Sequence, residues 1–258
     1  MKFAILALLG LTLLSVPDEI ELGREANVKM RHELVQFRDE RVLSYVAGLG
    51  KQLARSTRGP RYPYSFTIAD YREINAFALP GGPVWINRGV LHAATNESQV
   101  AGVLAHEIAH VAQRHAATQV MQGAFANWGL GLLSAMLGNA GGANAARTAA
   151  GAMTNSMFLK FSRDDESDAD RVGLQILTSA GWDARGMVEL FEILRREQKR
   201  DPTVVETFFS THPPPQERIE QLEAGVRGHR GGRRDSVEFE RARSRSLALP
   251  PPRKMPVD

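Results

Sequence analysis

The chain of 258 residues contains no cysteine. Disulfide bonds, a lipoprotein anchor, thiol catalysis and cysteine ligands to a metal ion are therefore excluded. The sequence also lacks a series of apolar runs of the roughly 20 residues that a membrane-spanning helix needs. Its hydrophobic fraction of 43% and charged fraction of 24% are ordinary for a globular protein, so one main domain with a sizeable core is expected.

The most informative stretch is the H-E-x-x-H motif formed by residues 106–110. Residues four apart lie on one face of a helix, so the imidazoles of His106 and His110 can bind one metal ion. Glu107 lies near the same point and can act as a general base. Zn²⁺ held by neutral nitrogens lowers the pKa of a bound water to about 7. The motif predicts a zinc-dependent peptide hydrolase; the alternative is a buried helix whose three costly polar side chains have no such role.

Local signals place this motif on a helix. Asn96 is a good N-cap, and Gln99 three residues later can complete a capping box. Neither proline nor glycine interrupts residues 103–120, so the helix is expected to continue through the motif. Apolar side chains recur at helical spacing and form a core-facing stripe: Val100, Val103, Leu104, Ile108 and Val111.

A catalytic zinc site usually has three protein ligands and one open position. A third histidine in the extended motif of some metalloproteases would require glycine at position 113 and histidine at position 116, where this chain has Gln113 and Ala116. A cysteine ligand is impossible. The remaining source of a third ligand is a carboxylate on a second helix.

Residues 162–173 supply such a helix. Ser162 and Asp165 form a capping box that predicts its start. Glu166 and Asp170 lie four apart on one face, so Glu166 can bind the metal while Asp170 accepts the free ring N–H of a liganding histidine. An acidic helix start also suits the helix dipole. That ordinary interpretation is favoured for the other acidic residues of the cluster, Asp164, Asp165 and Asp168.

Four separated stretches, in this order along the chain, resemble the M48 zinc metallopeptidases, which are gluzincins. They are 75–82 (NAFALPGG), 106–115 (HEIAHVAQRH), 162–173 (SRDDESDADRVG) and 210–213 (STHP). The resemblance covers roughly residues 18–224 and looks most like the compact soluble envelope members, whose relatives include periplasmic proteases of outer-membrane protein quality control. Such relatives often carry a tetratricopeptide domain, but no 34-residue repeat occurs here.

The resemblance implies that His106, His110 and Glu166 bind one Zn²⁺ per chain and that Glu107 is the catalytic base. It also implies an α+β fold: a helix-rich, zincin-like domain with a small β-sheet and an active-site helix. It singles out His212, because the matching histidine of some relatives occupies the fourth position of the metal and holds the enzyme latent. Three interpretations of His212 stay open: it blocks the metal, it donates a hydrogen bond to the oxyanion during catalysis, or it does neither.

Two segments, 64–70 and 83–87, alternate like strands, and a Pro-Gly-Gly turn at 80–82 separates them. The resemblance places residues 75–82 at an edge strand that captures substrate through main-chain hydrogen bonds. The alternative is that these residues only shape a buried turn. The expected substrate-binding residues are Asn75, Ala76, Phe77, Gly81 and Gly82.

Other segments complete a peptidase domain over residues 17–224. Helices are expected within 18–57, from 183 to 198 and from 216 to 224. His115 lies five residues after His110, away from the ligand face of the helix, and is interpreted as structural. Residues 116–146 carry no charged side chain and are interpreted as a loose helical flap beside the cleft.

The two ends differ from the domain. Residues 1–16 have one lysine before an apolar run, which is typical of a signal peptide or an N-terminal anchor and predicts export to the periplasm or cell envelope. Residues 225–258 hold eight arginines and one lysine against four acidic residues, a net charge of +5. This basic, proline-containing tail is expected to be disordered, with contact at a membrane surface as an option. No nucleic-acid-binding motif accompanies it.

These patterns favour a zinc endopeptidase that hydrolyses peptide bonds in unfolded or misassembled proteins of the cell envelope. The rival hypothesis is a chaperone-like protein that holds such substrates and whose zinc site is latent, blocked by His212.

Overall fold

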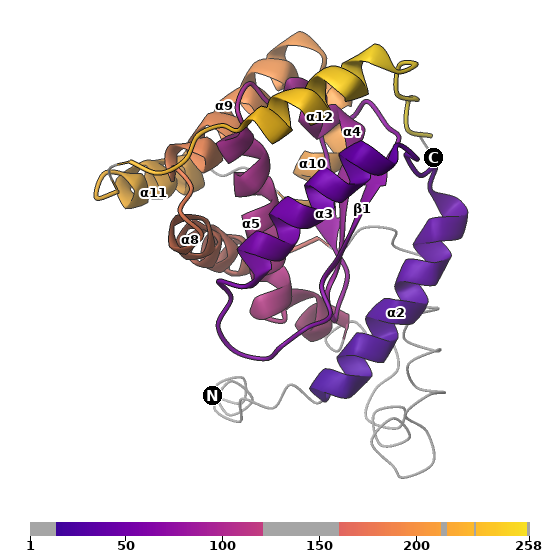
Figure 1. Cartoon of the computed structure of the whole chain (residues 1–258). Coiled ribbons are helices and arrows are strands. Elements are labelled where there is room, and N and C mark those ends of the chain that lie inside the picture. The colour runs from indigo at the N-terminus through magenta and orange to yellow at the C-terminus, as the bar shows by residue number, and fades with distance from the viewer. Residues whose placement is uncertain (1–13, 121–159, 213–215, 230, 257–258) are drawn as a thin grey trace.

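The computed structural model describes residues 14–120, 160–212, 216–229 and 231–256 (Figure 1). Most of the expected leader and of the expected flap therefore lies outside the described residues. Helices dominate, and a small sheet sits among them, which confirms the helix-rich α+β fold. The helices are α2 (Val16–Glu33), α3 (Glu40–Ala54), α4 (Arg88–Ala93), α5 (Glu97–Ala112), α8 (Arg163–Ser179), α9 (Arg185–Arg200), η1 (Pro202–Val204), α10 (Glu206–Thr211), α11 (Gln216–Val226) and α12 (Val237–Ala248).

The sheet has three strands: β1 (Ser65–Ala69), β2 (Ala76–Ala78) and β3 (Pro83–Asn87). Their order is β1-β3-β2, with β1 parallel and β2 antiparallel to the central β3. The predicted turn between β2 and β3 has φ of 70° at Gly81 and 121° at Gly82, a region that glycine enters without a steric cost. Because β3 is the central strand, β2 lies at one edge of the sheet.

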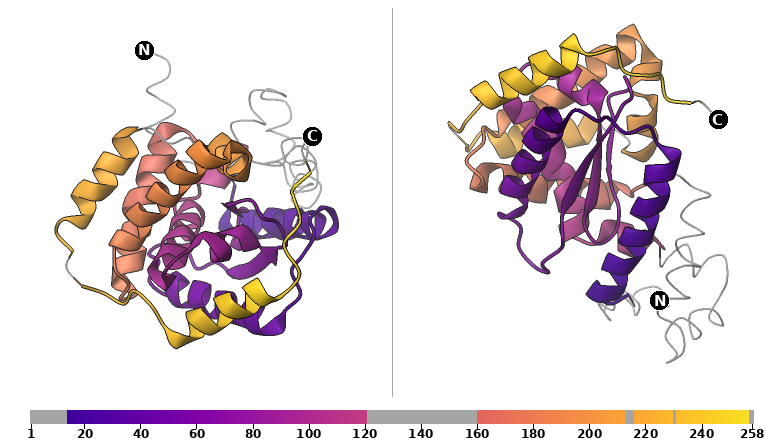
Figure 2. Two further views of the ribbon diagram at one scale, coloured as in Figure 1. Left: turned by 90° about the horizontal axis from the view of Figure 1, so that it is seen from above. Right: turned by 45° about the vertical axis from the view of Figure 1, so that its right-hand side comes forward.

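The sheet separates two apolar clusters because side chains alternate across a strand. On one face, Ile68 and Ile86 join the main core, which they share with α3, α5, α8 and α9. On the other face, Phe77 and Trp85 stack with their ring centroids 6.0 Å apart and pack with α2. Figure 2 shows α2 alone on this side of the strands, opposite the other helices.

Helix α5 is the centre of the domain. Every one of its residues is buried, and it packs against α3, α8 and α9 and also contacts β2 and β3. A helix that is covered on all sides has little freedom to shift, since interiors are close-packed. The H-E-x-x-H motif is therefore carried by a helix that is buried along its whole length.

The prediction that residues 225–258 form a disordered tail was wrong for the part described. Helix α12 crosses α3 and α4 (Figure 1) and buries Phe239 at 2% exposure. The buried guanidinium of Arg88 donates hydrogen bonds to Ser246 Oγ at 3.0 Å and to the carbonyl of Pro250 at 2.8 Å. Composition suggested a solvated segment, but Arg245 pairs with Asp39 and Arg234 pairs with Asp183 and Glu189. Some of its apolar residues, among them Phe239, are buried.

Candidate metal centre

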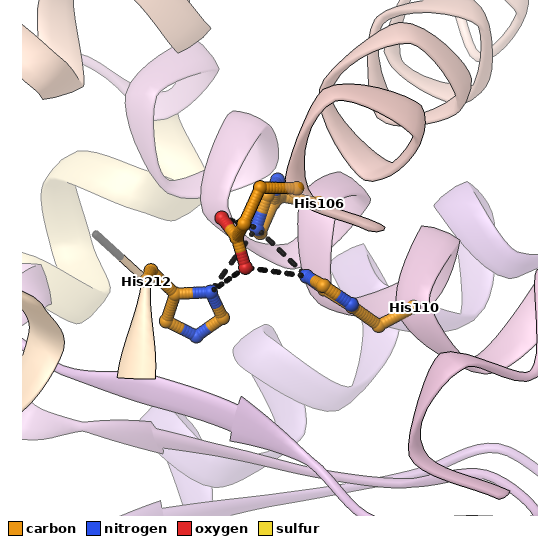
Figure 3. A group of neighbouring side chains, drawn as sticks. His106, His110 and His212 are labelled. Carbon is orange, nitrogen blue, oxygen red and sulfur yellow. Dashed lines mark hydrogen bonds and ion pairs between the residues drawn. The ribbon is translucent and has the colours of Figure 1, made fainter. Parts of the chain in front are cut away.

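His106 and His110 lie one turn apart on α5 and point toward the same place, with their Nε2 atoms 3.1 Å apart (Figure 3). The N-cap is as predicted, because the Asn96 side chain accepts the backbone N–H of Gln99 at 3.2 Å. The second half of the predicted capping box is absent. The amide oxygen of Gln99 accepts the backbone N–H of Thr95 instead, at 2.8 Å.

Glu166 reaches the two rings from α8. This helix begins with the predicted reciprocal capping box of Ser162 and Asp165. Glu166 Oε1 lies 3.5 Å from His110 Nε2, and Oε2 lies 3.6 Å from His106 Nε2. Two helices separated by 50 residues of chain therefore bring together the three predicted ligands.

His212 joins the same group from the end of α10. Its Nδ1 lies 2.8 Å from Glu166 Oε1 and 3.5 Å from His106 Nε2, and the ring turns toward the other two histidines (Figure 3). Its Nε2 lies 3.6 Å from Glu107 Oε1. The proline run at 213–215 that follows lies outside the described residues.

These side chains fit a metal ion. One ligand atom from each of His106, His110, Glu166 and His212 lies within 4.8 Å of the others, and all four residues are buried. Neighbouring ligands of a tetrahedral zinc ion are about 3.3 Å apart at metal–ligand distances of about 2.0 Å. Three imidazoles and a carboxylate are also ligands that Zn²⁺ accepts.

Burial and neighbouring charges shift the pKa values of the group. Burial raises the pKa of Glu107, and the nearby His212 and His106 only partly oppose it. Burial would also raise the pKa of Glu166, but His212, His110 and His106 outweigh it and the pKa is lowered. Burial lowers the pKa of His110 well below its usual value, which keeps the ring neutral and able to bind a metal. Both Glu107 oxygens lack a hydrogen-bond partner within the described part of the chain.

Asp170 lies where the sequence predicts it. Its Oδ1 is 3.0 Å from Nδ1 of His106, the ring nitrogen that faces away from the other ligand atoms. Sequence reasoning missed Arg218 on α11, which donates two hydrogen bonds to Asp170 and whose Nη1 lies 2.5 Å from Glu166 Oε2. Two buried carboxylates require a nearby positive charge. From this requirement one could have expected a basic residue near Glu166 and Asp170, but the sequence does not indicate that it is Arg218.

His115 is not among the four residues of the ligand group, but it contacts one of them, which an unbroken helix would not allow. Helix α5 ends at Ala112, and Arg114 has φ of 63°, so the single helix expected through residue 120 is broken at 113–114 before helical backbone resumes at 115–120. This turn brings His115 Nδ1 to 3.0 Å from His110 Nδ1. Sequence reasoning could not foresee this turn, because placing a non-glycine residue at positive φ costs about 1 kcal/mol or more and is not expected at an arginine.

The predicted substrate-binding residues lie along β2 and its turn, and all are buried. Ala76 and Ala78 face α5, whereas the Phe77 side chain faces the opposite cluster. The carbonyl of Asn75 accepts a hydrogen bond from the N–H of Asn87, and the N–H of Leu79 donates one to the carbonyl of Pro83. The odd-numbered residues of this segment therefore pair with the β3 side. The backbone groups of Ala76 and Ala78 therefore point to the open edge.

The turn after β2 packs against α2, whereas the edge of β2 lies beside Glu107. A Cβ on Gly81 would lie 2.4 Å from the Cα of Ile20, so this glycine is required by the contact with α2. The side-chain amide of Asn75 is 1% exposed and has no hydrogen-bond partner within the described residues. The backbone N–H of Ala78 faces Glu107 and lowers the pKa of that carboxyl. The edge of β2 thus lies beside the base, and Gly81 and Gly82 shape the turn.

Comparison with known proteins agrees with this geometry. The model of peptidase family M48 matches residues 40–226. The beta-barrel assembly-enhancing protease of Escherichia coli K12 is 31% identical over 211 residues, which are 80% of this chain and 43% of that protein. The mitochondrial metalloendopeptidase OMA1 of Saccharomyces cerevisiae is 32% identical over 151 residues, covering 57% of this chain and 42% of OMA1. The metalloprotease YcaL of Escherichia coli K12 is 28% identical over 178 residues, covering 69% of this chain and 67% of YcaL.

A buried group of three histidines and a glutamate on a helix-rich α+β fold defines the metallopeptidase class of site. The chain belongs to peptidase family M48. It spans less than half the length of the beta-barrel assembly-enhancing proteases that it matches. Within the described residues, no helix has both the length and the apolar character to cross a membrane.

Proposed function

We propose that this protein is a zinc-dependent endopeptidase. His106, His110 and Glu166 would hold one Zn²⁺, and the observation that carries the proposal is the convergence of their ligand atoms beside the buried carboxylate of Glu107. Zinc bound there would polarise a carbonyl group and lower the pKa of water. Glu107 would accept the proton of the attacking water and deliver a proton to the leaving amine.

The chain supplies the remaining parts of the mechanism. Asp170 would accept a hydrogen bond from the Nδ1–H of His106, which would leave the Nε2 lone pair of that ring available for the metal. The open edge of β2 offers the backbone groups of Ala76 and Ala78 to an extended peptide. Such a peptide would run past Glu107, because Ala78 faces that side chain.

We further propose that the described arrangement is a latent one. His212 Nδ1 stands among the three other ligand atoms, so four protein ligands would fill a tetrahedral shell and leave no open position. His212 would have to withdraw before a substrate carbonyl could enter. The role of blocking the metal is therefore favoured over a role in catalysis in this arrangement.

The proposed substrates are unfolded or misassembled proteins of the cell envelope, and the proposed location is the periplasm or envelope. The similarity to proteases that are named for enhancing β-barrel assembly supports both. An extended edge strand also favours unfolded chains, because it needs main-chain groups that a folded substrate has already paired. Family membership and the position of Glu107 favour hydrolysis over the substrate-holding alternative.

The test uses the full chain loaded with zinc and an unfolded, casein-like substrate. The wild type is expected to contain one zinc per chain and to cleave internal peptide bonds. Glu107→Gln should retain the metal and lose at least about a thousandfold in rate, as expected for loss of a base that also serves as an acid. Zinc content near zero in the wild type, or full activity in Glu107→Gln, would refute the proposal.

A further inference from the structure

A buried ion pair connects α2 to Arg114, which lies two residues after the end of α5. Glu19 on α2 is 0% exposed, and its Oε2 accepts hydrogen bonds from Arg114 Nε at 2.8 Å and from the hydroxyl of Tyr62 at 3.0 Å. Arg114 also donates to the carbonyl of Leu14 at 2.5 Å. The guanidinium of Arg114 is therefore anchored at the N-terminal end of α2. Residue 19 lies outside the region that the family model matches.

Arg114 is anchored in an unusual backbone conformation. Within the described residues, it is the one non-glycine residue with positive φ. In an unbroken helix, side chains at 110 and 115 would point about 140° apart around the axis. The left-handed backbone at residue 114 turns the two side chains toward each other instead. The rings of His110 and His115 then meet edge to face with centroids 5.0 Å apart.

His115 then stands between a metal-ligand residue and two carboxylates. His110 presents Nε2 to the other ligand atoms, which places its ring proton on Nδ1. That Nδ1–H donates a hydrogen bond to Nδ1 of His115 at 3.0 Å. The Nε2–H of His115 faces Asp168 Oδ2 at 3.6 Å and Asp165 Oδ1 at 3.8 Å. His115 is 8% exposed, so water has little access to replace these contacts.

Close backbone contacts give Glu19 a defined position. A Cβ on Gly81 would lie 2.6 Å from the carbonyl oxygen of Glu19, and a Cβ on Gly23 would lie 1.7 Å from the carbonyl oxygen of Pro80. Helix α2 is thus seated directly on the turn that follows β2. A carboxylate on a helix held this closely can act as a rigid anchor.

We propose that Glu19 and Arg114 are positioning residues for the metal centre: through the reversed backbone at 114, they hold His115 against Nδ1 of His110. The ring of His110 is then oriented toward Glu166 and His106. This inference rests on the proposed function, since it concerns the same metal. The inference assigns to α2, which carries no part of the H-E-x-x-H motif, a role in positioning the metal ligands.

The test measures how fast the zinc-loaded full chain releases its metal to an excess of a chromogenic chelator. Glu19→Gln keeps the shape of the side chain and removes its charge. It should release zinc about tenfold faster, because His115, the outer partner of the liganding His110, would no longer be held in place. Glu21→Gln, at an exposed position on the same helix, should release zinc at the wild-type rate. Leu22→Ala, which opens a cavity under the same helix, should lower stability without the tenfold change.

A double-mutant comparison separates positioning from general loosening of the fold. His115→Ala should also speed release, and adding Glu19→Gln to His115→Ala should cause no further change, because both act through one ring. The inference is overturned if Glu19→Gln releases zinc at the wild-type rate, or if it accelerates release equally with and without His115. A wild-type chain that binds no zinc would instead refute the proposed function.

Discussion

Arg218 and Asp170 form a buried bidentate ion pair, with Nε 2.7 Å from Oδ2 and Nη2 2.8 Å from Oδ1. The pair joins α11 to α8 behind the metal centre. It holds the carboxylate whose Oδ1 also lies 3.0 Å from Nδ1 of His106. Burial would raise the pKa of Asp170, but the hydrogen bonds from Arg218 and His106 lower it, so the group is anionic and suited to accept a hydrogen bond from the ring N–H.

Replacement of Asp170 should weaken metal binding. Asp170→Asn keeps the shape of the side chain but loses the negative charge that accepts the His106 Nδ1–H and pairs with Arg218. We expect zinc affinity to fall about 10- to 100-fold, measured by competition with a chelator. Asp164→Asn, on the exposed side of the first turn of α8, is the matched control and should bind zinc as the wild type does. Equal affinity in all three proteins would contradict the role of Asp170.

Removal of His212 should raise activity if this residue blocks the metal. His212→Ala frees the fourth position while His106, His110 and Glu166 remain, so cleavage of unfolded casein should increase several-fold with zinc content unchanged. The measurement is the initial rate at fixed enzyme and zinc. A large fall in rate at full zinc content would show instead that His212 assists catalysis, for example as a donor to the oxyanion.

The packing of α12 should contribute measurably to stability. Phe239 is 2% exposed, and its ring lies 6.2 Å from that of Tyr45. Phe239→Ala should lower the free energy of unfolding by about 3–5 kcal/mol, measured by urea denaturation of the metal-free chain. Val237→Ala on the same helix, where the side chain is 54% exposed, should change it by less than about 0.5 kcal/mol. Similar small effects of both substitutions would mean that α12 does not pack as described.

Acid should weaken the attachment of the segment that precedes α12. Burial opposes ionisation of Asp183, but hydrogen bonds from Arg185 and Arg234 lower its pKa from 3.8 to about 2. A lowered folded-state pKa stabilises the fold above pH 3.8, and this stabilisation is lost as the pH falls toward 2. Asp183→Asn should therefore be less stable than the wild type at pH 7, and the difference should shrink between pH 4 and 2. Denaturant midpoints at each pH measure this, and a difference that is independent of pH would contradict it.

The two helices of the metal site could be predicted because their signals are local. Asn96 and the box of Ser162 and Asp165 start the helices where the sequence indicates, and four-residue spacing puts His106 and His110 on one face. Prediction failed for the end of α5, since no local signal marks the positive φ of Arg114, whose side chain pairs with Glu19, a residue 95 positions earlier in the chain. It failed for α12 because net charge does not reveal whether each arginine has a carboxylate partner in the fold.

The sequence alone therefore determined the chemical inventory: the candidate ligands, the proposed base, the helix starts, the turn glycines and the membership of a known family. The tertiary structure decided which distant groups meet, namely Arg218 with Asp170, His212 with the ligand group, and α2 with the end of α5. The physical reason is range. Caps, turns and helical spacing act over three or four residues, whereas a buried charge is satisfied by whichever partner the packing of the whole domain brings within hydrogen-bond distance.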